Sequence, residues 1–379
     1  MKILRTPEIY TGEESLNQVI NIAKKINVRR MLVISGRHIV QVGIYEKLEG
    51  ILNHAGIECI GCNRVEPEPS IELVDQIVSF SRASRAEAVI GLGGGSSLDT
   101  AKIAAALMTN HEAMEKYIGI ELLKNNPLPV IAIPTTAGTG SEVTPVAILS
   151  DTGEQLKKAI YSSKMIPAYA LLDPLLTMDL PRNITVSSGM DALAHAIEAY
   201  TSVHASIYTD ALALRALRLL TDNIRIACSD EADVKVRESM LMGSLLAGLA
   251  FANAGVTAVH AFANPLGGMF HVPHGIANSL MLSTIMTYNA AGNENKFADI
   301  AKCLTKDPDA TSNRGIDEIN KLCNDLMVPA DLQAVGIPEE AIPAMAERVM
   351  KNPKLLINNR RSIAYEDALE LYRKAYIKP

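Results

Sequence analysis

The sequence lacks several features that would assign a chain to a functional class at once. It has no basic stripe and a formal net charge of −6, so nothing indicates nucleic-acid binding. It has no low-complexity tract, and disorder is not expected. The first residues, "MKILRTPEIY", lack the apolar core and cleavage site of a signal peptide.

Paired cysteines are also lacking. The five cysteines are odd in number and widely scattered, which argues against a disulfide framework. Cys59 and Cys62 have C-x-x-C spacing, but no second pair completes a zinc site. Reduced thiols are typical of a cytoplasmic protein, which is the location we expect.

Charge is missing from one long stretch. Residues 239–293 contain no Asp, Glu, Lys or Arg. A membrane span needs about 20 largely apolar residues, but polar residues, glycines and a proline interrupt this stretch. The interruptions are Asn253, Gly255, His260, Asn264, Pro265, Gly267 and Gly268. We therefore expect no membrane segment here, but a helical core built around a polar group.

What the first half does contain is an alternation of apolar strands and helices. With 379 residues, 48% of them hydrophobic, the chain is long enough for two domains with sizeable cores. Apolar runs predict strands at 29–35, 57–62, 86–95, 129–136 and 168–174. Helical segments such as 71–84 separate the first four. This pattern predicts a parallel sheet covered on both faces.

The second half changes character near residue 181. Beyond it the apolar residues have helical spacing, as in "YTDALALRALRLLTDNI", and no convincing strand follows. The fold class we predict is therefore α/β followed by all-α. Residues 1–181 form a dinucleotide-binding domain and residues 182–379 a helical domain. Ligands of such pairs usually bind between the domains, at the carboxyl ends of the strands.

Two glycine-rich turns follow predicted strands. The first is "GGGSSLDTAK" (93–102), and the second is "PTTAGTGSE" (134–142). Glycines allow backbone N–H groups to approach an anion, and the following helix offers its positive N-terminus. Asp99 lies in that helix's first turn. Neither G-x-G-x-x-G nor the Walker pattern is present, so each turn alone is weak evidence. Two together favour dinucleotide binding over simple tight turns.

Histidines and one aspartate form a candidate metal site. Asp191 and His195 lie one helical turn apart in "SSGMDALAHAIEAYTS", and His260, His271 and His274 fall within fifteen positions of the charge-free stretch. Imidazole nitrogens with a carboxylate oxygen suit zinc or iron(II). The alternatives are a structural ion pair and ordinary hydrogen-bonded core histidines. Spacing alone does not decide between these interpretations.

Four motifs in order resemble the iron-containing (metal-dependent, group III) alcohol dehydrogenase family. They are "GGGSSLDTAK", "PTTAGTGSE", "GMDALAHAIEAY" and "HAFANPLGGMFHVPHG", and the likeness covers essentially the whole chain. It implies a Rossmann-like N-terminal domain and a helical C-terminal domain that hold a nicotinamide between them. The metal ligands it implies are Asp191, His195, His260 and His274. The cofactor contacts it implies are Gly94, Gly95, Ser96, Thr135, Thr136, Thr139 and Lys158, with Asp99 in the same loop.

The resemblance also implies a reaction. A metal, Fe2+ or Zn2+, polarises the substrate oxygen while hydride passes between NAD(P)(H) and a short-chain aldehyde or alcohol. Phe251, Val146 and Ile148 would line the substrate pocket, although core packing explains them equally well. The family implies a homodimer or larger homo-oligomer.

Three departures from the family pattern carry expectations. Gly36 stands where members often have an Asp that binds the ribose 2′-OH, and Arg37 follows it. We expect NADP(H) to be accepted, with NAD(H) still open as the working cofactor. Asn264 replaces a histidine thought to relay the proton. His271 is then a candidate catalytic group, with water or the cofactor ribose as alternatives.

The third departure is near the C-terminal end, where "INNRRS" contributes Arg360 and Arg361, while Glu68 replaces a usual Asn. Paired arginines usually form a solvated surface. If one reaches the active site, it would bind an anionic aldehyde such as sulfoacetaldehyde.

Other functions remain open at this stage. The same two-domain design also resembles glycerol dehydrogenases and the lyase dehydroquinate synthase, which bind a nucleotide cofactor and a metal. A non-catalytic nucleotide sensor is a further alternative. An intact ligand set argues against the sensor, because a sensor needs no Lewis acid.

Overall fold

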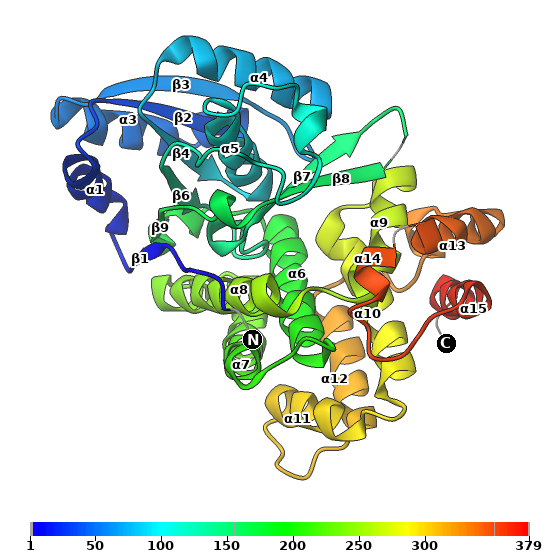
Figure 1. Cartoon of the computed structure of the whole chain (residues 1–379). Coiled ribbons are helices and arrows are strands. Elements are labelled where there is room, and N and C mark those ends of the chain that lie inside the picture. The colour runs from blue at the N-terminus through cyan, green and yellow to red at the C-terminus, as the bar shows by residue number, and fades with distance from the viewer. Residues whose placement is uncertain (1–2, 155, 352, 378–379) are drawn as a thin grey trace. The chain divides into compact units, whose positions relative to one another are not determined.

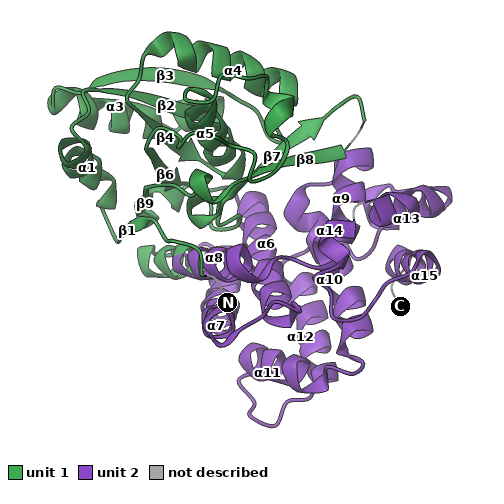
Figure 2. Ribbon diagram, in the orientation of Figure 1, with its two compact units in different colours: residues 1–180, 233–241 green, residues 181–232, 242–379 purple. Residues whose placement is uncertain are grey.

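The computed structural model describes residues 3–154, 156–351 and 353–377. The chain divides into two compact units, shown in Figure 2. Unit 1 contains residues 1–180 and 233–241, and unit 2 contains residues 181–232 and 242–379. The functional domain boundary at residue 181 stays a prediction.

Unit 1 is built on a six-stranded parallel sheet in the order β1-β9-β6-β4-β2-β3. The strands are β1 (Glu8–Thr11), β2 (Arg30–Gly36), β3 (Glu58–Val65), β4 (Ala88–Gly93), β6 (Val130–Pro134) and β9 (Tyr169–Leu172). The helices of this unit are α1 (Gln18–Ile26), α2 (Arg37–Gln41), α3 (Ile44–His54), α4 (Ile71–Ser84) and α5 (Gly95–Leu107) (Figure 1).

Alternate residues of the central strands bury themselves in two different cores. In β2, Met31 and Val33 pack in one apolar cluster with Leu48 of α3, whereas Leu32 and Ile34 pack in another with α4 and α5 residues. Successive strand side chains point to opposite faces. Helices therefore cover both faces of the sheet, and the predicted parallel α/β arrangement is confirmed.

Three strands of unit 1 form a separate small sheet. It contains β5 (Gly119–Ile120), β7 (Val146–Asp151) and β8 (Leu156–Tyr161) in the order β5-β8-β7. Strands β7 and β8 are antiparallel. Neither this sheet nor the edge strand β1 was predicted. Strands β1 and β5 are short, β8 contains two lysines, and β7 alternates between buried and more exposed positions.

Unit 2 is helical, and the part of it that the structure describes contains no strand (Figure 1). Its helices are α6 (Arg182–Thr201), α7 (Ile207–Ala227), α8 (Val234–Ala254, beginning in unit 1), α9 (Ala258–Phe270), α10 (His274–Ala290), α11 (Glu294–Thr305), α12 (Ser312–Asp325), α13 (Ile342–Lys351), α14 (Pro353–Leu356) and α15 (Tyr365–Tyr376). The all-helical prediction is confirmed.

The charge-free stretch forms most of α8 and all of α9 and α10. Among the described residues, no helix on its own has the length and apolar character of a membrane span, and only the sharply bent pair α8 and α9 meets that test together.

Candidate metal centre and cofactor loops

Three helices of unit 2 supply the predicted metal ligands. Asp191 and His195 lie one turn apart on α6, His260 lies in the first turn of α9, and His274 begins α10. Helix α10 packs against both α6 and α9. At Gly275 the approach is so close that a Cβ atom would lie 1.8 Å from the carbonyl oxygen of Ser187. Only glycine permits this packing, which brings His274 next to Asp191.

The ligand atoms of these four side chains converge. His260 Nε2 lies 3.0 Å from His195 Nε2. Asp191 Oδ1 lies 4.0 Å from His195 Nε2 and 3.7 Å from the Nε2 atoms of His260 and His274. The ligand atoms of Asp191, His195 and His260 all lie within 4.8 Å of one another.

This donor set fits a divalent cation. Ligands held tetrahedrally at 2.0–2.2 Å lie roughly 3.3–3.6 Å from each other, which is the middle of the observed range. Three imidazole nitrogens and one carboxylate oxygen suit iron(II) or zinc. Burial of several polar groups in so apolar a region is also less costly when one cation satisfies them together.

The cluster is closed on one side and accessible on another. Asp191, His195 and His260 are 4–6% exposed, whereas the side chain of His274 is 31% exposed. The ring of Phe251 stacks on His195 with centroids 4.3 Å apart. An apolar wall therefore shields His195, and solvent or a small molecule has access on the side of His274.

Two buried residues that the sequence analysis missed support the ligands. Asn278, one turn after His274, donates a hydrogen bond of 2.7 Å from its Nδ2 atom to Asp191 Oδ1. Glu198 contacts Nδ1 of His260 with its carboxylate. The spacing of Glu198 could have indicated this role, because residues 191, 195 and 198 share one face of α6.

Both buried carboxylates of the cluster are stabilised in the charged form. Burial acts to raise the pKa of Asp191, but its three histidine neighbours and Asn278 outweigh burial and lower it. Burial opposes ionisation of Glu198 as well, and His260 and Thr257 lower its pKa below the usual value. Because both shifts are downward, the stability that these groups contribute is present at neutral pH and is lost as the pH falls.

His271 does not join the converging ligand atoms described above. It lies at the C-cap of α9 with φ 56° and is exposed, so its backbone conformation turns the chain towards α10. Asn264 lies one turn after His260 in α9 and is partly buried. A catalytic role for His271 stays a prediction.

The two glycine-rich turns of unit 1 lie side by side. Strands β4 and β6 are neighbours and end at the same edge of the sheet. Thr135 N–H donates to Gly93 O, and a Cβ atom on Gly95 would lie 2.7 Å from Thr139 Cγ2. A Cβ atom on Gly94 would lie 3.4 Å from Thr136 Oγ1, an ordinary contact distance. Gly94, Gly95 and Ser96 open α5, whose first N–H groups lack intrahelical acceptors and suit an anion.

Asp99 bonds to protein groups around these turns. It accepts a hydrogen bond of 2.5 Å from Ser141 Oγ and one of 2.9 Å from Ile148 N, and it lies 3.1 Å from Lys102 Nζ. Lys102 is fully buried and also donates to carbonyl oxygens of Ser141 and Val146. Asp99 and Lys102 thus brace the second turn against α5. Burial lowers the pKa of Lys102, while Asp99 and Glu142 act against this shift.

The hairpin places two successive lysines differently. Lys158 pairs with Asp151 at 2.5 Å and with Glu154 at 3.1 Å. Lys157 instead donates to Glu68 at 2.8 Å, and Glu68 N–H donates to Ser96 Oγ. Alternation along β8 puts these lysines on opposite faces. Lys157 therefore lies nearer to the first glycine-rich turn through Glu68, and a cofactor contact by Lys158 stays a prediction.

Gly36 ends β2 and caps α2. A Cβ atom there would lie 3.0 Å from Val65 O, so a larger residue requires a small adjustment. Val146 and Ile148 lie on β7, and Ile148 is 38% exposed.

The paired arginines have partners within unit 2. Arg360 Nε donates to Thr201 O at 3.1 Å. Arg361 donates to Tyr288 O at 3.0 Å and stacks 3.7 Å from the Tyr288 ring centroid. Thr201 lies six residues beyond His195 on α6, roughly 9 Å along the helix. These contacts do not support direct binding of a two-carbon anionic aldehyde by either arginine.

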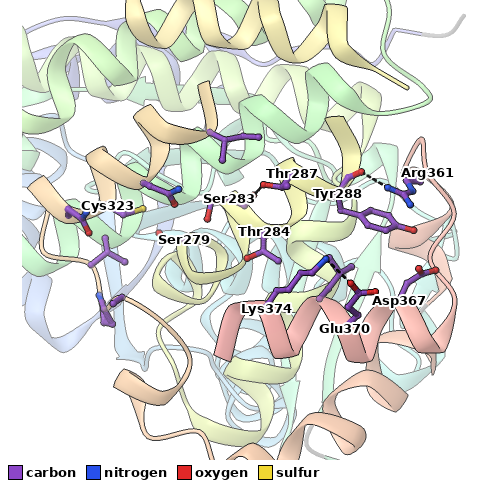
Figure 3. Close-up of a pocket in the computed structure, with 17 residues that line it drawn as sticks. Ser279, Ser283, Thr284, Thr287, Tyr288, Cys323, Arg361, Asp367, Glu370 and Lys374 are labelled. Carbon is purple, nitrogen blue, oxygen red and sulfur yellow. Dashed lines mark hydrogen bonds and ion pairs between the residues drawn. The ribbon is translucent and has the colours of Figure 1, made fainter. Parts of the chain in front are cut away.

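A cavity of about 530 Å³ in unit 2 lies apart from the ligand cluster, among residues of α10, α12 and α15 (Figure 3). None of the four ligand side chains lines it. Its labelled charges are engaged: Lys374 pairs with Glu370 at 2.7 Å, Arg361 bonds to Tyr288, and Asp367 accepts a hydrogen bond from Ala364 N at 2.8 Å. We therefore assign the chemistry to the ligand cluster and not to this cavity.

Comparisons with known proteins agree with this geometry. Residues 6–174 match the family model of iron-containing alcohol dehydrogenase, and residues 185–376 match that of the family's C-terminal part. The chain is 35% identical to long-chain-alcohol dehydrogenase 1 of Geobacillus thermodenitrificans, covering 99% of this chain and 96% of that one. It is 33% identical to sulfoacetaldehyde reductase of Bilophila wadsworthia, covering 96% of each.

Solved structures give the same result. A crystal structure of 1,3-propanediol oxidoreductase matches with a TM-score of 0.95 and 34% identity, covering 99% of this chain and 100% of that one. Sulfoacetaldehyde reductase from Bifidobacterium kashiwanohense, in complex with NAD+, matches with a TM-score of 0.90 and 28% identity, covering 100% and 99%. The chain belongs to the iron-containing alcohol dehydrogenase family, and is thereby an oxidoreductase acting on CH–OH groups.

Proposed function

We propose that the chain is a metal-dependent alcohol dehydrogenase that reduces a short-chain aldehyde with NAD(P)H or oxidises the corresponding alcohol. The observation that carries this proposal is the convergence of one carboxylate oxygen and three imidazole nitrogens in a buried cluster. A sensor of nucleotides would have no use for such a donor set.

Asp191, His195, His260 and His274 are the proposed ligands. A divalent cation held by them, Fe2+ or Zn2+, would supply a Lewis acid to the substrate oxygen. Phe251 against His195 keeps water from one side of the cluster, which strengthens electrostatic interactions inside it. The exposed imidazole of His271, on the turn between α9 and α10, is the group we propose to exchange the proton with solvent.

The nucleotide is proposed to bind at the two glycine-rich turns. The N–H groups at Gly94, Gly95 and Ser96 would bind its phosphates, and the hydroxyls of Thr135, Thr136 and Thr139 would add donors. Asp99 contributes by holding the second turn in place. At the end of β2, Gly36 carries no charge that would repel a 2′-phosphate, so we propose that both NADH and NADPH are accepted.

The preferred substrate is proposed to be a neutral short-chain aldehyde. Some relatives reduce sulfoacetaldehyde. However, the guanidinium groups of Arg360 and Arg361 bond to backbone carbonyls of α6 and α10, so we do not assign either of them to an anionic substrate. We further propose a homodimer or larger homo-oligomer, as the family resemblance implies, and a cytoplasmic location, because reduced thiols are typical of one.

The test is the loss of absorbance at 340 nm with butanal or sulfoacetaldehyde, run with NADH and with NADPH. We expect butanal-dependent oxidation of the nucleotide that a chelator abolishes and Fe2+ or Zn2+ restores. Nucleotide binding without any aldehyde-dependent oxidation, in metal-loaded protein, would favour the sensor. Turnover of sulfoacetaldehyde alone, impaired in Arg360→Ala or Arg361→Ala, would overturn the preference for neutral substrates.

The cofactor part has its own test. Gly36→Asp is expected to raise the KM for NADPH more than that for NADH, because the added carboxylate repels a 2′-phosphate. The tight space beside Val65 affects both nucleotides equally, so the ratio of the two KM values is the measurement. An unchanged ratio would remove this argument.

A further inference from the structure

Glu198 is a buried carboxylate with an unusual number of donors. Its side chain is 1% exposed, and it lies on α6 three residues after His195. A charge in so apolar a place is stable only when its oxygens are well hydrogen-bonded. The two oxygens of this carboxylate have separate partners, and the separation indicates a function.

Oxygen Oε1 binds the beginning of α9. It accepts from Thr257 N at 2.9 Å, Thr257 Oγ1 at 2.8 Å, Val259 N at 2.8 Å and His260 N at 3.3 Å. These N–H groups belong to the N-cap and first turn of the helix and have no intrahelical acceptor. Glu198 therefore caps α9 from another helix, and four donors fix the position of this oxygen.

Oxygen Oε2 contacts the ring of His260 at Nδ1. An ionised carboxylate only accepts hydrogen bonds, so Nδ1 must carry the proton. The second ring nitrogen, Nε2, then carries a lone pair that a metal can bind, and here Asn278 Nδ2 lies 3.2 Å from this atom. His260 Nε2 also lies 3.0 Å from His195 Nε2 and 3.7 Å from Asp191 Oδ1, inside the ligand cluster.

We infer that Glu198 is a positioning residue that holds His260 in the tautomer and orientation needed to bind the metal, and that couples metal binding to the N-terminus of α9. This inference rests on the proposed metal site. Hydrogen-bonded partners of this kind orient ligating histidines and increase their basicity. Together, Asp191 and Glu198 place two negative charges around the site, and these balance the two positive charges of a divalent cation.

The substitution Glu198→Gln tests this inference. Because four donors face Oε1, the amide oxygen of Gln takes that position and the NH2 group faces His260 Nδ1. Two donors then oppose each other unless the proton moves to Nε2, where it blocks coordination. We expect the dissociation constant for Zn2+, measured by chelator competition on the metal-stripped full chain, to rise about 10- to 100-fold.

The matched control is Thr257→Val. It removes one donor from Oε1 but leaves the contact between Oε2 and His260. We expect its unfolding temperature to fall while its Zn2+ dissociation constant stays within about threefold of wild type. The Co2+-substituted protein should show an altered visible spectrum in Glu198→Gln and an unaltered one in Thr257→Val.

Each outcome bears on the inference. Zn2+ binding by Glu198→Gln as tight as wild type, or an equal loss in Thr257→Val, would overturn the role of Glu198 while leaving the metal site intact. A wild-type chain that binds no Zn2+ would overturn the metal site itself.

A measurement on wild type covers the case in which Glu198→Gln does not fold. In zinc-loaded protein with 15N-labelled histidine, the resonances missing from His260→Gln identify His260. We expect its Nδ1 to be protonated and its Nε2 to bind the metal. An unprotonated Nδ1 would contradict the inference.

Discussion

In the ligand cluster of unit 2, side chains from three helices make the contacts that define the site, whereas in the paired turns of unit 1 the backbone defines it. The cluster needs a carboxylate and three imidazoles at fixed positions. The turns need a residue without a side chain at Gly95, because a Cβ atom there would lie 2.7 Å from Thr139 Cγ2. A metal site is therefore visible in a sequence as residue types, and a phosphate site only as glycines.

The two regions share one feature. Each region depends on a buried charged residue that is not itself proposed to bind the metal or the nucleotide. Glu198 supports His260, and Lys102 supports the turn around Ser141. Both charges are satisfied by backbone groups from a second element. We therefore expect a substitution that disables one region to leave ligand binding at the other region unchanged.

The largest effect is expected from the ligand side chains. His195→Ala should lower kcat by about 10³-fold or more, because a Lewis acid contributes several kcal/mol to the reaction. Since the glycine-rich turns are built independently, NADH binding measured by fluorescence should change less than about threefold. Loss of NADH binding together with activity would show that the two sites are not separable.

Removal of the buried lysine is expected to destabilise unit 1. Lys102→Met leaves Asp99 and the carbonyl groups of Ser141 and Val146 without their donor. Breaking a buried pair in this way costs about 3–5 kcal/mol, which urea unfolding measures. Lys116→Met, at an exposed lysine, is the control and should change stability by less than about 0.5 kcal/mol. Equal stabilities of the two variants would contradict a stabilising role of Lys102 at the second turn.

A smaller, pH-dependent effect is expected at Glu142 in the second turn. Burial raises its pKa from 4.5 to about 7, so the folded state binds more protons than the unfolded state between these values. Stability should therefore decrease as the pH rises from 4.5 to about 7, by up to about 3 kcal/mol from this group. Glu142→Gln should remove that decrease. Urea unfolding across this range checks it, and parallel curves for both proteins would refute it.

The smallest effect is expected at the first glycine-rich turn. Gly95→Ala brings a Cβ atom to 2.7 Å from Thr139 Cγ2, which must move away. We expect the dissociation constant for NADH to rise about tenfold, about 1.4 kcal/mol, with unchanged metal content. Gly50→Ala, on α3 with no atom within 4 Å of the added Cβ, serves as the control and should not affect NADH binding. Similar binding by both variants would show that the turn tolerates a side chain.

The sequence predicted those parts of the molecule that depend on residue type and apolar pattern. The runs at 30–36 and 88–93 are continuous and buried, so β2 and β4 were recognisable. The edge strand β1 was not, because it has four residues and its outer positions are exposed. The ligand set Asp191, His195, His260 and His274 was implied by the family resemblance, and its binding of a metal stays a prediction.

Other parts depend on tertiary context that one sequence does not contain. Glu198 and Lys102 look like ordinary polar positions until a second element supplies their partners. The register of the β7–β8 hairpin decides that Lys157, and not Lys158, pairs with Glu68. A residue at such a position cannot be chosen from spacing alone, because alternation reverses with a shift of one residue.

The most direct test of the account is the metal content of the purified chain. Wild type and Asp191→Ala are each reconstituted with Fe2+ or Zn2+ and desalted, and the bound metal is then measured by mass spectrometry. We predict one equivalent of metal per chain in wild type and less than about a tenth of that in Asp191→Ala, since loss of one ligand and its charge weakens binding strongly. A wild-type chain without metal after reconstitution, or a variant that retains one equivalent, would contradict the claim that these four side chains hold a cation.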